Sequence, residues 1–136
     1  GYHFQLGKGV TLRDGKDVTI VAVGMMVQMA LKAADILSAE GISARVLDFH
    51  TIKPLDQELL LAAAKETGAI VTSEEHNVIG GLGAAVAEFL SPVPVIRHGV
   101  NDQFGRSGKA DQVLAAYGLT PEVLADKARQ AIAKKG

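Results

Sequence analysis

The chain contains no cysteine and no tryptophan, and aromatic residues make up only 4% of its 136 residues. Without cysteine it cannot form disulfides, bind a metal through thiolates or use a cysteine nucleophile. The lack of disulfides agrees with a reducing compartment, so we expect a cytoplasmic protein. The first residue is glycine and no signal peptide follows it, which suggests a processed chain or one cut from a longer protein.

Long apolar runs and a strong charge of one sign are also missing. The longest apolar stretch, residues 18–27, is well short of the roughly 20 residues that a membrane span needs. Lysine and arginine total 14 against 15 aspartate and glutamate residues, which gives a net charge of -1. A nucleic-acid-binding protein normally carries a basic surface. We therefore expect a soluble globular domain that binds neither membranes nor nucleic acid.

Short β-branched segments alternate with longer segments that carry one apolar stripe. The predicted strands cover residues 18–23, 44–49, 69–72 and 94–97, and the predicted helices residues 25–40, 54–67, 80–90, 107–117 and 120–135. This alternation is typical of a parallel sheet with right-handed crossovers and helices on both faces. The length and the 48% hydrophobic content predict a single α/β domain over residues 1–136.

One further strand is predicted ahead of the alternating segments, at residues 10–12. Five residues separate it from the strand that starts at Val18, and they include Asp14-Gly15. An Asp-Gly pair between two strands is typical of a β-hairpin. We therefore expect this first strand to run antiparallel to the rest.

Polar residues follow the predicted strands, at the edge where ligands and partners usually meet a parallel sheet. His50 follows the second of the alternating strands, Glu75 and His76 the third, and His98 the fourth. These residues could form a proton-transfer or metal site. Alternatively, they are the ordinary polar ends of loops, with a structural or interfacial role. No pair has the spacing of metal ligands, so the second interpretation is favoured.

Three glycines, Gly80, Gly81 and Gly83, open the third of the predicted helices. Glycine at a helix start lets backbone N–H groups approach an anion, and the helix N-terminus favours negative charge. Close packing of the helix on the sheet explains the glycines as well, and we favour it. The spacing fits neither a dinucleotide fingerprint nor a phosphate-binding loop.

Three segments in this order resemble the C-terminal domain of the transketolase family. They are residues 48–56 (Asp-Phe-His-Thr-Ile-Lys-Pro-Leu-Asp), 74–83 (Glu-Glu-His-Asn-Val-Ile-Gly-Gly-Leu-Gly) and 102–108 (Asp-Gln-Phe-Gly-Arg-Ser-Gly). The resemblance runs from about residue 7 to residue 134. The same domain closes 1-deoxyxylulose-5-phosphate synthases and the β subunits of pyruvate-dehydrogenase-type decarboxylases, but these segments look most like transketolases encoded as two separate halves.

The resemblance implies a three-layer α/β/α domain whose five-stranded, mostly parallel sheet has one antiparallel strand. It also implies transfer of a two-carbon ketol unit between sugar phosphates, as in the pentose phosphate pathway, on thiamine diphosphate with Mg²⁺. In that family two preceding domains hold the cofactor across a dimer interface, with a Gly-Asp-Gly motif for the metal. Here Arg13 precedes Asp14-Gly15, so the motif is missing and no catalytic, cofactor-binding or metal-binding residue is carried over.

We therefore interpret the chain as an assembly domain or subunit of a transketolase, inactive alone. Its expected partners are the N-terminal thiamine-diphosphate-binding domains or subunit, together with a second copy in a homodimer. The candidate interface or anion-binding residues are Glu75, His76, Gly80, Gly81, Gly83, His50 and His98. Two alternatives stay open: a pyruvate-dehydrogenase-type β subunit that docks an acyltransferase core, and a regulatory module that binds an anion or sugar phosphate.

Overall fold

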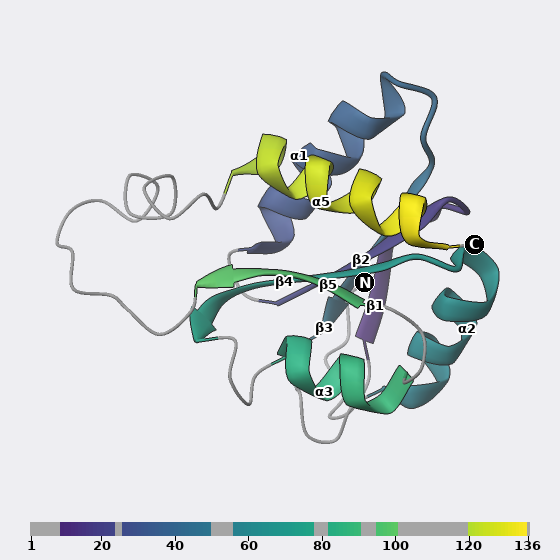
Figure 1. Ribbon diagram of the computed structural model, residues 1–136, viewed down its shortest axis with the longest axis vertical. Helices are drawn as coiled ribbons and strands as arrows, with labels where there is room; N and C mark the ends of the chain where they lie inside the picture. The colour runs from purple at the N-terminus through teal and green to yellow at the C-terminus, as the bar shows by residue number, and fades with distance from the viewer. Residues whose placement is uncertain are drawn as a thin grey trace, which may run out of the picture.

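The computed structural model describes residues 9–23, 26–49, 56–77, 82–90, 95–100 and 120–135, which form one sheet with helices on both faces (Figure 1). The strands are β1 (Gly9–Arg13), β2 (Val18–Ala22), β3 (Ala44–Phe49), β4 (Ile70–Asn77) and β5 (Val95–Val100). The helices are α1 (Met26–Ser38), α2 (Gln57–Thr67), α3 (Leu82–Leu90) and α5 (Pro121–Lys134). The helix predicted over residues 107–117 lies outside the described residues. Among the described helices, none combines the length and the apolar character that a membrane crossing requires.

The strand order in the sheet is β1-β3-β2-β4-β5. β1 runs antiparallel to β3, and the other neighbouring pairs are parallel. The predicted mixed sheet with one antiparallel strand is therefore confirmed. The predicted hairpin is wrong, because β3 lies between β1 and β2 and pairs with both of them. The turn at residues 14–17 crosses over the start of β3 and does not join two neighbouring strands.

Gly15 makes this crossing possible. A Cβ atom added to it would lie 2.3 Å from the carbonyl carbon of Ala44 and 2.4 Å from the backbone nitrogen of Arg45. Both atoms belong to the β3 backbone, so the crossing turn lies directly on the strand and leaves no room for a side chain there. The Asp-Gly pair thus marks a close approach of two backbones, a use of glycine that differs from the two-residue hairpin turn.

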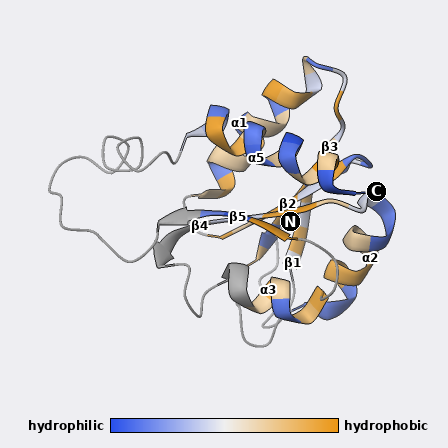
Figure 2. Ribbon diagram, viewed as in Figure 1, coloured by the Kyte–Doolittle hydropathy of each residue, from blue (hydrophilic) through white to orange (hydrophobic). Residues whose placement is uncertain are grey.

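Each face of the sheet carries its own apolar core. Strand β2 places Ile20 on one face and Val21 on the other, because successive side chains of a strand alternate. Helices α1 and α5 cover the face of Ile20, and helices α2 and α3 cover the face of Val21. Figure 2 shows the apolar residues in the strands and on the helix sides turned toward them. The three-layer α/β/α architecture is therefore confirmed.

Alanines make up most of the buried side chains that α1 and α5 contribute to their core. The two helices pack against each other as well as on the sheet. Their buried alanines are Ala30, Ala33, Ala34, Ala125, Ala128 and Ala131. Methyl side chains allow the two helix backbones to lie close together, so little space is left for any larger group.

Side chains cap the starts of two helices. Asp56 accepts a hydrogen bond from the N–H of Leu59 at the start of α2, and Thr120 accepts one from the N–H of Val123 at the start of α5, both at 3.2 Å. Gly68 ends α2 in the left-handed conformation, with φ of +71°. The predicted stop at Gly68 and the predicted start at Thr120 are confirmed.

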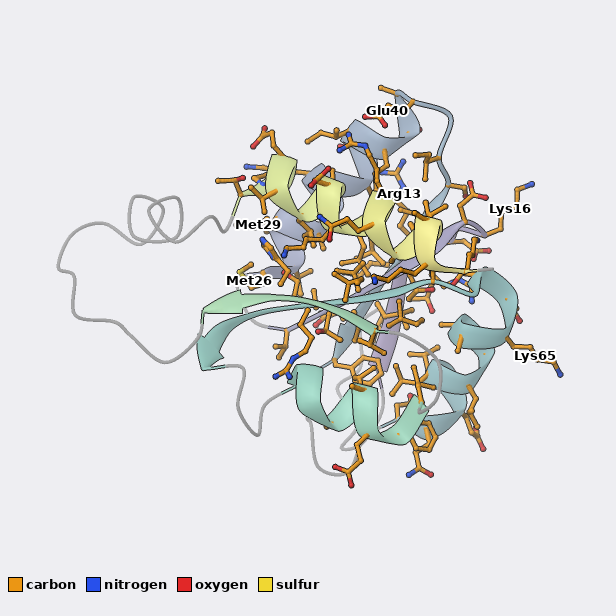
Figure 3. The ribbon with its side chains drawn as sticks, in the orientation of Figure 1. Arg13, Lys16, Met26, Met29, Glu40 and Lys65 are labelled. Carbon is orange, nitrogen blue, oxygen red and sulfur yellow. The ribbon has the colours of Figure 1, made fainter. Side chains whose placement is uncertain are left out.

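Ion pairs on the surface join α1 to its neighbours. Arg13 of β1 contacts Asp35 at 2.6 Å, and Arg129 of α5 pairs with Glu40, just beyond the end of α1 (Figure 3 labels Arg13 and Glu40). The hydrogen bond from Arg129 holds the pKa of the Glu40 carboxyl below its usual value. Exposed pairs of this kind contribute little to stability, so the alanine-lined core dominates the attachment of α5.

Candidate functional site

The edge at which the parallel strands end, called here the carboxyl edge, is where the sequence places its candidate residues. His50, Gly80 and Gly81 lie outside the described residues. The backbone of Glu75 and His76 belongs to the last part of β4, and Gly83 is the second residue of α3. The expectation that residues 74–77 form a loop is wrong, because β4 continues to Asn77 with a register irregularity against β5 between Glu74 and Asn77.

His98 also lies in a strand, where the sequence predicts a loop. It occupies the fourth position of β5, and its ring is buried. Its Nδ1 lies 3.1 Å from Oγ of Ser73, which faces it from β4 and is fully buried. Both groups are closed off from solvent, so the Ser73–His98 pair is internal to the sheet. It is a buried polar contact that ties β4 to β5 near the carboxyl edge.

The partner of His98 could have been found from the sheet register. Ser73 is opposite His98, and Ala22 of β2 is opposite Ser73. Ala22 is also opposite Asp48 of β3. Asp48, Ser73 and His98 thus form a row across the sheet, with the small Ala22 between the first two. The missing information was how far β4 and β5 extend, which the short apolar runs of the sequence underestimate.

Asp48 is the charged member of this row. Its side chain is half-buried, and this burial raises the pKa of the carboxyl above its ordinary value. The folded protein therefore holds this proton more tightly than the unfolded chain does. At a pH below the pKa that Asp48 has in the unfolded chain, its protonated side chain contributes fully to stability. This contribution is lost as the pH rises through the higher pKa that Asp48 has in the folded protein. At neutral pH the ionised carboxylate lowers the stability of the domain.

We predict that Asp48→Asn raises the urea midpoint of unfolding at pH 7, where the native side chain is ionised. At pH 3 the variant and the native chain are expected to unfold at nearly the same urea concentration, because the native carboxyl is then largely protonated. Asp35→Asn is the control, since Asp35 is mostly exposed and pairs with Arg13, so its loss brings no gain. A lower midpoint for Asp48→Asn at pH 7 would contradict the prediction.

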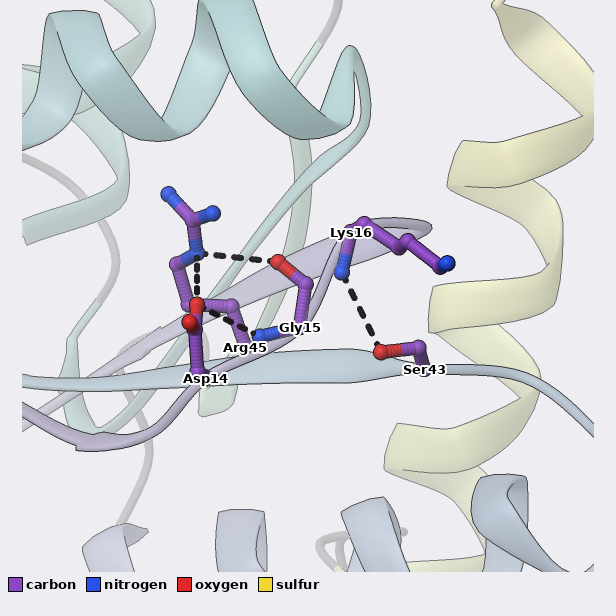
Figure 4. Close-up of a pocket in the computed structure, with 5 residues that line it drawn as sticks. All are labelled: Asp14, Gly15, Lys16, Ser43 and Arg45. Carbon is purple, nitrogen blue, oxygen red and sulfur yellow. Dashed lines mark hydrogen bonds and ion pairs between the residues drawn. The ribbon is translucent and has the colours of Figure 1, made fainter.

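The opposite edge of the sheet, called here the amino edge, carries a polar pocket of about 250 Å³ (Figure 4). Asp14, Gly15, Lys16, Ser43 and Arg45 line it. Arg45 donates to the carbonyl of Gly15 at 3.0 Å and to Glu66 at 2.7 Å, and its Nε lies 3.3 Å from Asp14. Its guanidinium is therefore already engaged by two carboxylates and a carbonyl, which leaves little attraction for an anionic ligand.

Other contacts close the amino edge further. Asp17 and Ser43 exchange two hydrogen bonds, from N–H of Asp17 to the Ser43 carbonyl and from N–H of Ser43 to the Asp17 carboxylate. The ammonium of Lys135, just after α5, donates to the carbonyls of Asp17 and Thr67. Lys16 and Lys65 point outward into solvent on this side of the molecule (Figure 3). The polar groups named here thus bond to one another, and these bonds hold the turns of the amino edge together.

The described residues do not bring together the side chains that a divalent metal needs. Across the described part of the chain, no three histidine, cysteine, aspartate or glutamate side chains gather as metal ligands would. In the pocket at the amino edge, Glu66 and Asp14 already neutralise the charge of Arg45. The Ser73–His98 pair is buried.

The family model described as "Transketolase, C-terminal domain" matches residues 7–124. The chain belongs to the transketolase C-terminal domain family. The sequence resemblance is thus confirmed, and so is the fold that it implies. For a transketolase C-terminal domain, the five-stranded mixed sheet with two helical layers is the expected architecture.

Known proteins similar to this domain include both separate subunits and longer enzymes. The 6-deoxy-6-sulfo-D-fructose transketolase subunit of Clostridium sp. (strain MSTE9) is 48% identical over 97% of this chain and 42% of its own length. A solved structure described as "Split gene transketolase, inactive beta4 tetramer" is 51% identical, with a TM-score of 0.94 over 99% of this chain and 45% of its own. The 1-deoxy-D-xylulose-5-phosphate synthase of Heliobacterium modesticaldum is 46% identical over 92% of this chain and 20% of its own length. The chain therefore spans less than half of each of these proteins.

Proposed function

We propose that this domain is the C-terminal part of a thiamine-diphosphate-dependent transketolase that transfers a two-carbon ketol unit between sugar phosphates in the cytoplasm. The observation that carries this proposal is the similarity over almost the whole chain, at 48% and 51% identity, to proteins described as a transketolase subunit and a split gene transketolase. Similarity to 1-deoxy-D-xylulose-5-phosphate synthases agrees with the same cofactor family.

Within that enzyme the domain supports assembly, and the cofactor belongs to the rest of the protein. Its described polar groups bond to one another at the amino edge and at the Ser73–His98 pair, and no group of metal ligands is present among them. A cofactor held between subunits needs those subunits in a fixed arrangement, because small displacements of reacting groups cost rate heavily. A rigid extra domain that contributes to the dimer interface would supply this arrangement.

Reconstitution tests the proposal. The chain alone, supplied with Mg²⁺ and thiamine diphosphate, is expected to show no ketol transfer and no cofactor binding by calorimetry. The complete subunit, mixed with the N-terminal subunit of the split enzyme, is expected to transfer a two-carbon unit from a ketose phosphate to an aldose phosphate. With pyruvate as the donor in place of the ketose phosphate, formation of 1-deoxy-D-xylulose 5-phosphate without any ketol transfer would overturn the proposed reaction.

The assembly role has its own test in the same complete enzyme. A subunit that lacks residues 7–134, and so all of α5, is expected to lose the dimer at micromolar protein concentration, as measured by analytical ultracentrifugation. The intact subunit under the same conditions is the control. A tight dimer that survives the deletion would contradict the role in assembly while leaving the proposed reaction standing.

A further inference from the structure

The start of β1 and the start of α2 are joined by one carboxylate. Asp56, just before α2, is buried and uses its two oxygens on different elements. Oδ1 accepts from the N–H of Leu59 and so caps α2, at 3.2 Å. Oδ2 accepts from the N–H of Gly9, the first residue of β1, at 2.9 Å. Forty-seven positions separate Asp56 from Gly9 in the sequence, so this contact fixes two distant parts of the chain to each other.

The joint is built closely around Gly9. A Cβ atom at this position would lie 2.7 Å from Cε1 of Phe49 and 2.8 Å from Cδ2 of Leu59. Phe49 is the last residue of β3 and is fully buried, so its ring has little room to move. The absence of a side chain at Gly9 therefore lets the strand start against Phe49 and within reach of Asp56. We call Gly9, Phe49, Asp56 and Leu59 the β1 joint.

The position of the β1 joint in the sheet gives it a role beyond local stability. Gly9 pairs with Phe49 at the end of β3, so the joint lies at the carboxyl edge. Lys135, near the other end of the described chain, is bonded to the amino edge. Within the described sheet β1 is an outer strand and pairs with β3 alone. A polypeptide that precedes the domain therefore reaches it at the carboxyl edge, through a strand held by a single neighbour.

We propose that Asp56 is a positioning residue. By pinning the start of β1 to the first turn of α2, it fixes where the polypeptide that precedes the domain joins it. This inference rests on the proposed function, in which the domain follows the cofactor-binding part of a transketolase subunit. With the pin in place, the domain is already oriented when the subunits associate. Without it, association must itself order the start of β1, and fixing backbone costs free energy for each residue that is ordered.

The change Asp56→Asn separates the two tasks of this side chain. Asparagine caps a helix about as well as aspartate, so its carbonyl oxygen can keep the bond to the N–H of Leu59. Its amide group then faces the N–H of Gly9, and two donors cannot bond to each other. Shape is preserved and the cap is kept, while the pin on β1 is lost. Asp56→Ser is a second variant, because serine also caps well but is too short to hold both partners.

Matched controls exist elsewhere in the domain. Asp17→Asn makes the same chemical change at the amino edge, where Asp17 accepts from the N–H of Ser43 at 2.7 Å. Thr120→Ala removes the N-cap of α5, where the hydroxyl accepts from the N–H of Val123. Thr120→Ala loses a hydrogen bond to the backbone, and Asp17→Asn loses the charge that strengthens one; both leave the β1 joint intact.

The test uses complete subunits and two measurements. In Asp56→Asn and Asp56→Ser, we expect hydrogen exchange at Gly9 to become faster and the dissociation constant of the assembled enzyme to rise about tenfold, the cost of ordering roughly one further residue. Ketol transfer should fall at low protein concentration and recover at high concentration. The two controls should lower the thermal midpoint and leave the dissociation constant at its native value.

Two outcomes would overturn the inference. One is a native dissociation constant in both Asp56 variants despite faster exchange at Gly9. The bond from Gly9 to Asp56 would then be broken in the variants without any effect on assembly. The other is an equal rise in Asp17→Asn, because general destabilisation would then account for the effect. Neither outcome depends on which reaction the enzyme catalyses. If the native enzyme assembles but transfers no ketol unit, the proposed function is refuted. The dissociation constants of the variants still decide the role of Asp56.

Discussion

Replacing Gly15 with alanine is expected to lower the free energy of unfolding by about 3 kcal/mol or more, one of the largest effects of any single change in the domain. The new Cβ atom would lie 2.3 Å from the carbonyl carbon of Ala44 and 2.6 Å from its oxygen. These are backbone atoms of β3, so the clash cannot be relieved by rotating a side chain. The crossing turn must lift off the strand, which also breaks the bond from Arg45 to the Gly15 carbonyl.

Urea denaturation of Gly15→Ala and Gly41→Ala, measured side by side, separates two effects on stability. One is the steric clash of the new Cβ atom, and the other is the backbone strain of replacing a glycine. Gly41 has φ of +82° and open space around its Cβ position, so alanine there meets only backbone strain, about 1–2 kcal/mol. Gly15→Ala should therefore unfold at a clearly lower urea concentration than Gly41→Ala. If the order were reversed, the turn would not lie on β3 as the structure has it.

A leucine at position 128 is expected to cost about 3 kcal/mol, because α5 packs on α1 and the sheet through alanines. Ala128 is fully buried, between the equally small Ala125 and Ala131 on the same helix face. Three extra carbon atoms must push the helix away from its core. Such a shift would also move Lys135, whose ammonium bonds the turns of the amino edge. Thermal unfolding followed by circular dichroism measures the loss.

The same substitution at Ala133 is the matched control. Ala133 lies on α5 and is exposed, so leucine there changes the helix surface alone and should alter stability by no more than about 0.5 kcal/mol. Leucine has nearly the same helix propensity as alanine, which keeps the comparison clean. Equal effects at the two positions would show that α5 is not closely packed at Ala128.

Most of the fold could be predicted from the sequence because its signals are local. The β-branched run that starts at Val18, the stop at Gly68 and the cap at Thr120 each depend on a few neighbouring residues, and the structure has them where the sequence indicates. Strand lengths were predicted less well. β4 continues through polar residues to Asn77 and β5 through His98 to Val100, because ladder hydrogen bonds to a neighbouring strand extend a strand beyond its apolar part.

The candidate site was predicted less completely than the fold. His98 was expected on a loop, but it is buried against Ser73 across the β4–β5 pair. Asp56 was expected only at the start of a helix, but it also holds Gly9. Both corrections concern contacts between residues 25 or more positions apart in the sequence. Such contacts depend on strand order and register, to which patterns of apolar and polar residues give no direct access.

The sequence by itself determined the class of this protein: an α/β domain of the transketolase C-terminal family, with helices on both faces of a mostly parallel sheet. Periodicity and helix-end signals are carried by neighbouring residues, so they can be interpreted without a structure. Only the tertiary structure decided that β1 pairs with β3, that Gly15 is required where two backbones touch, and that Asp56 joins β1 to α2. These features arise where distant segments meet, and an Asp-Gly pair is equally compatible with a hairpin and a crossing until the neighbouring strand is placed.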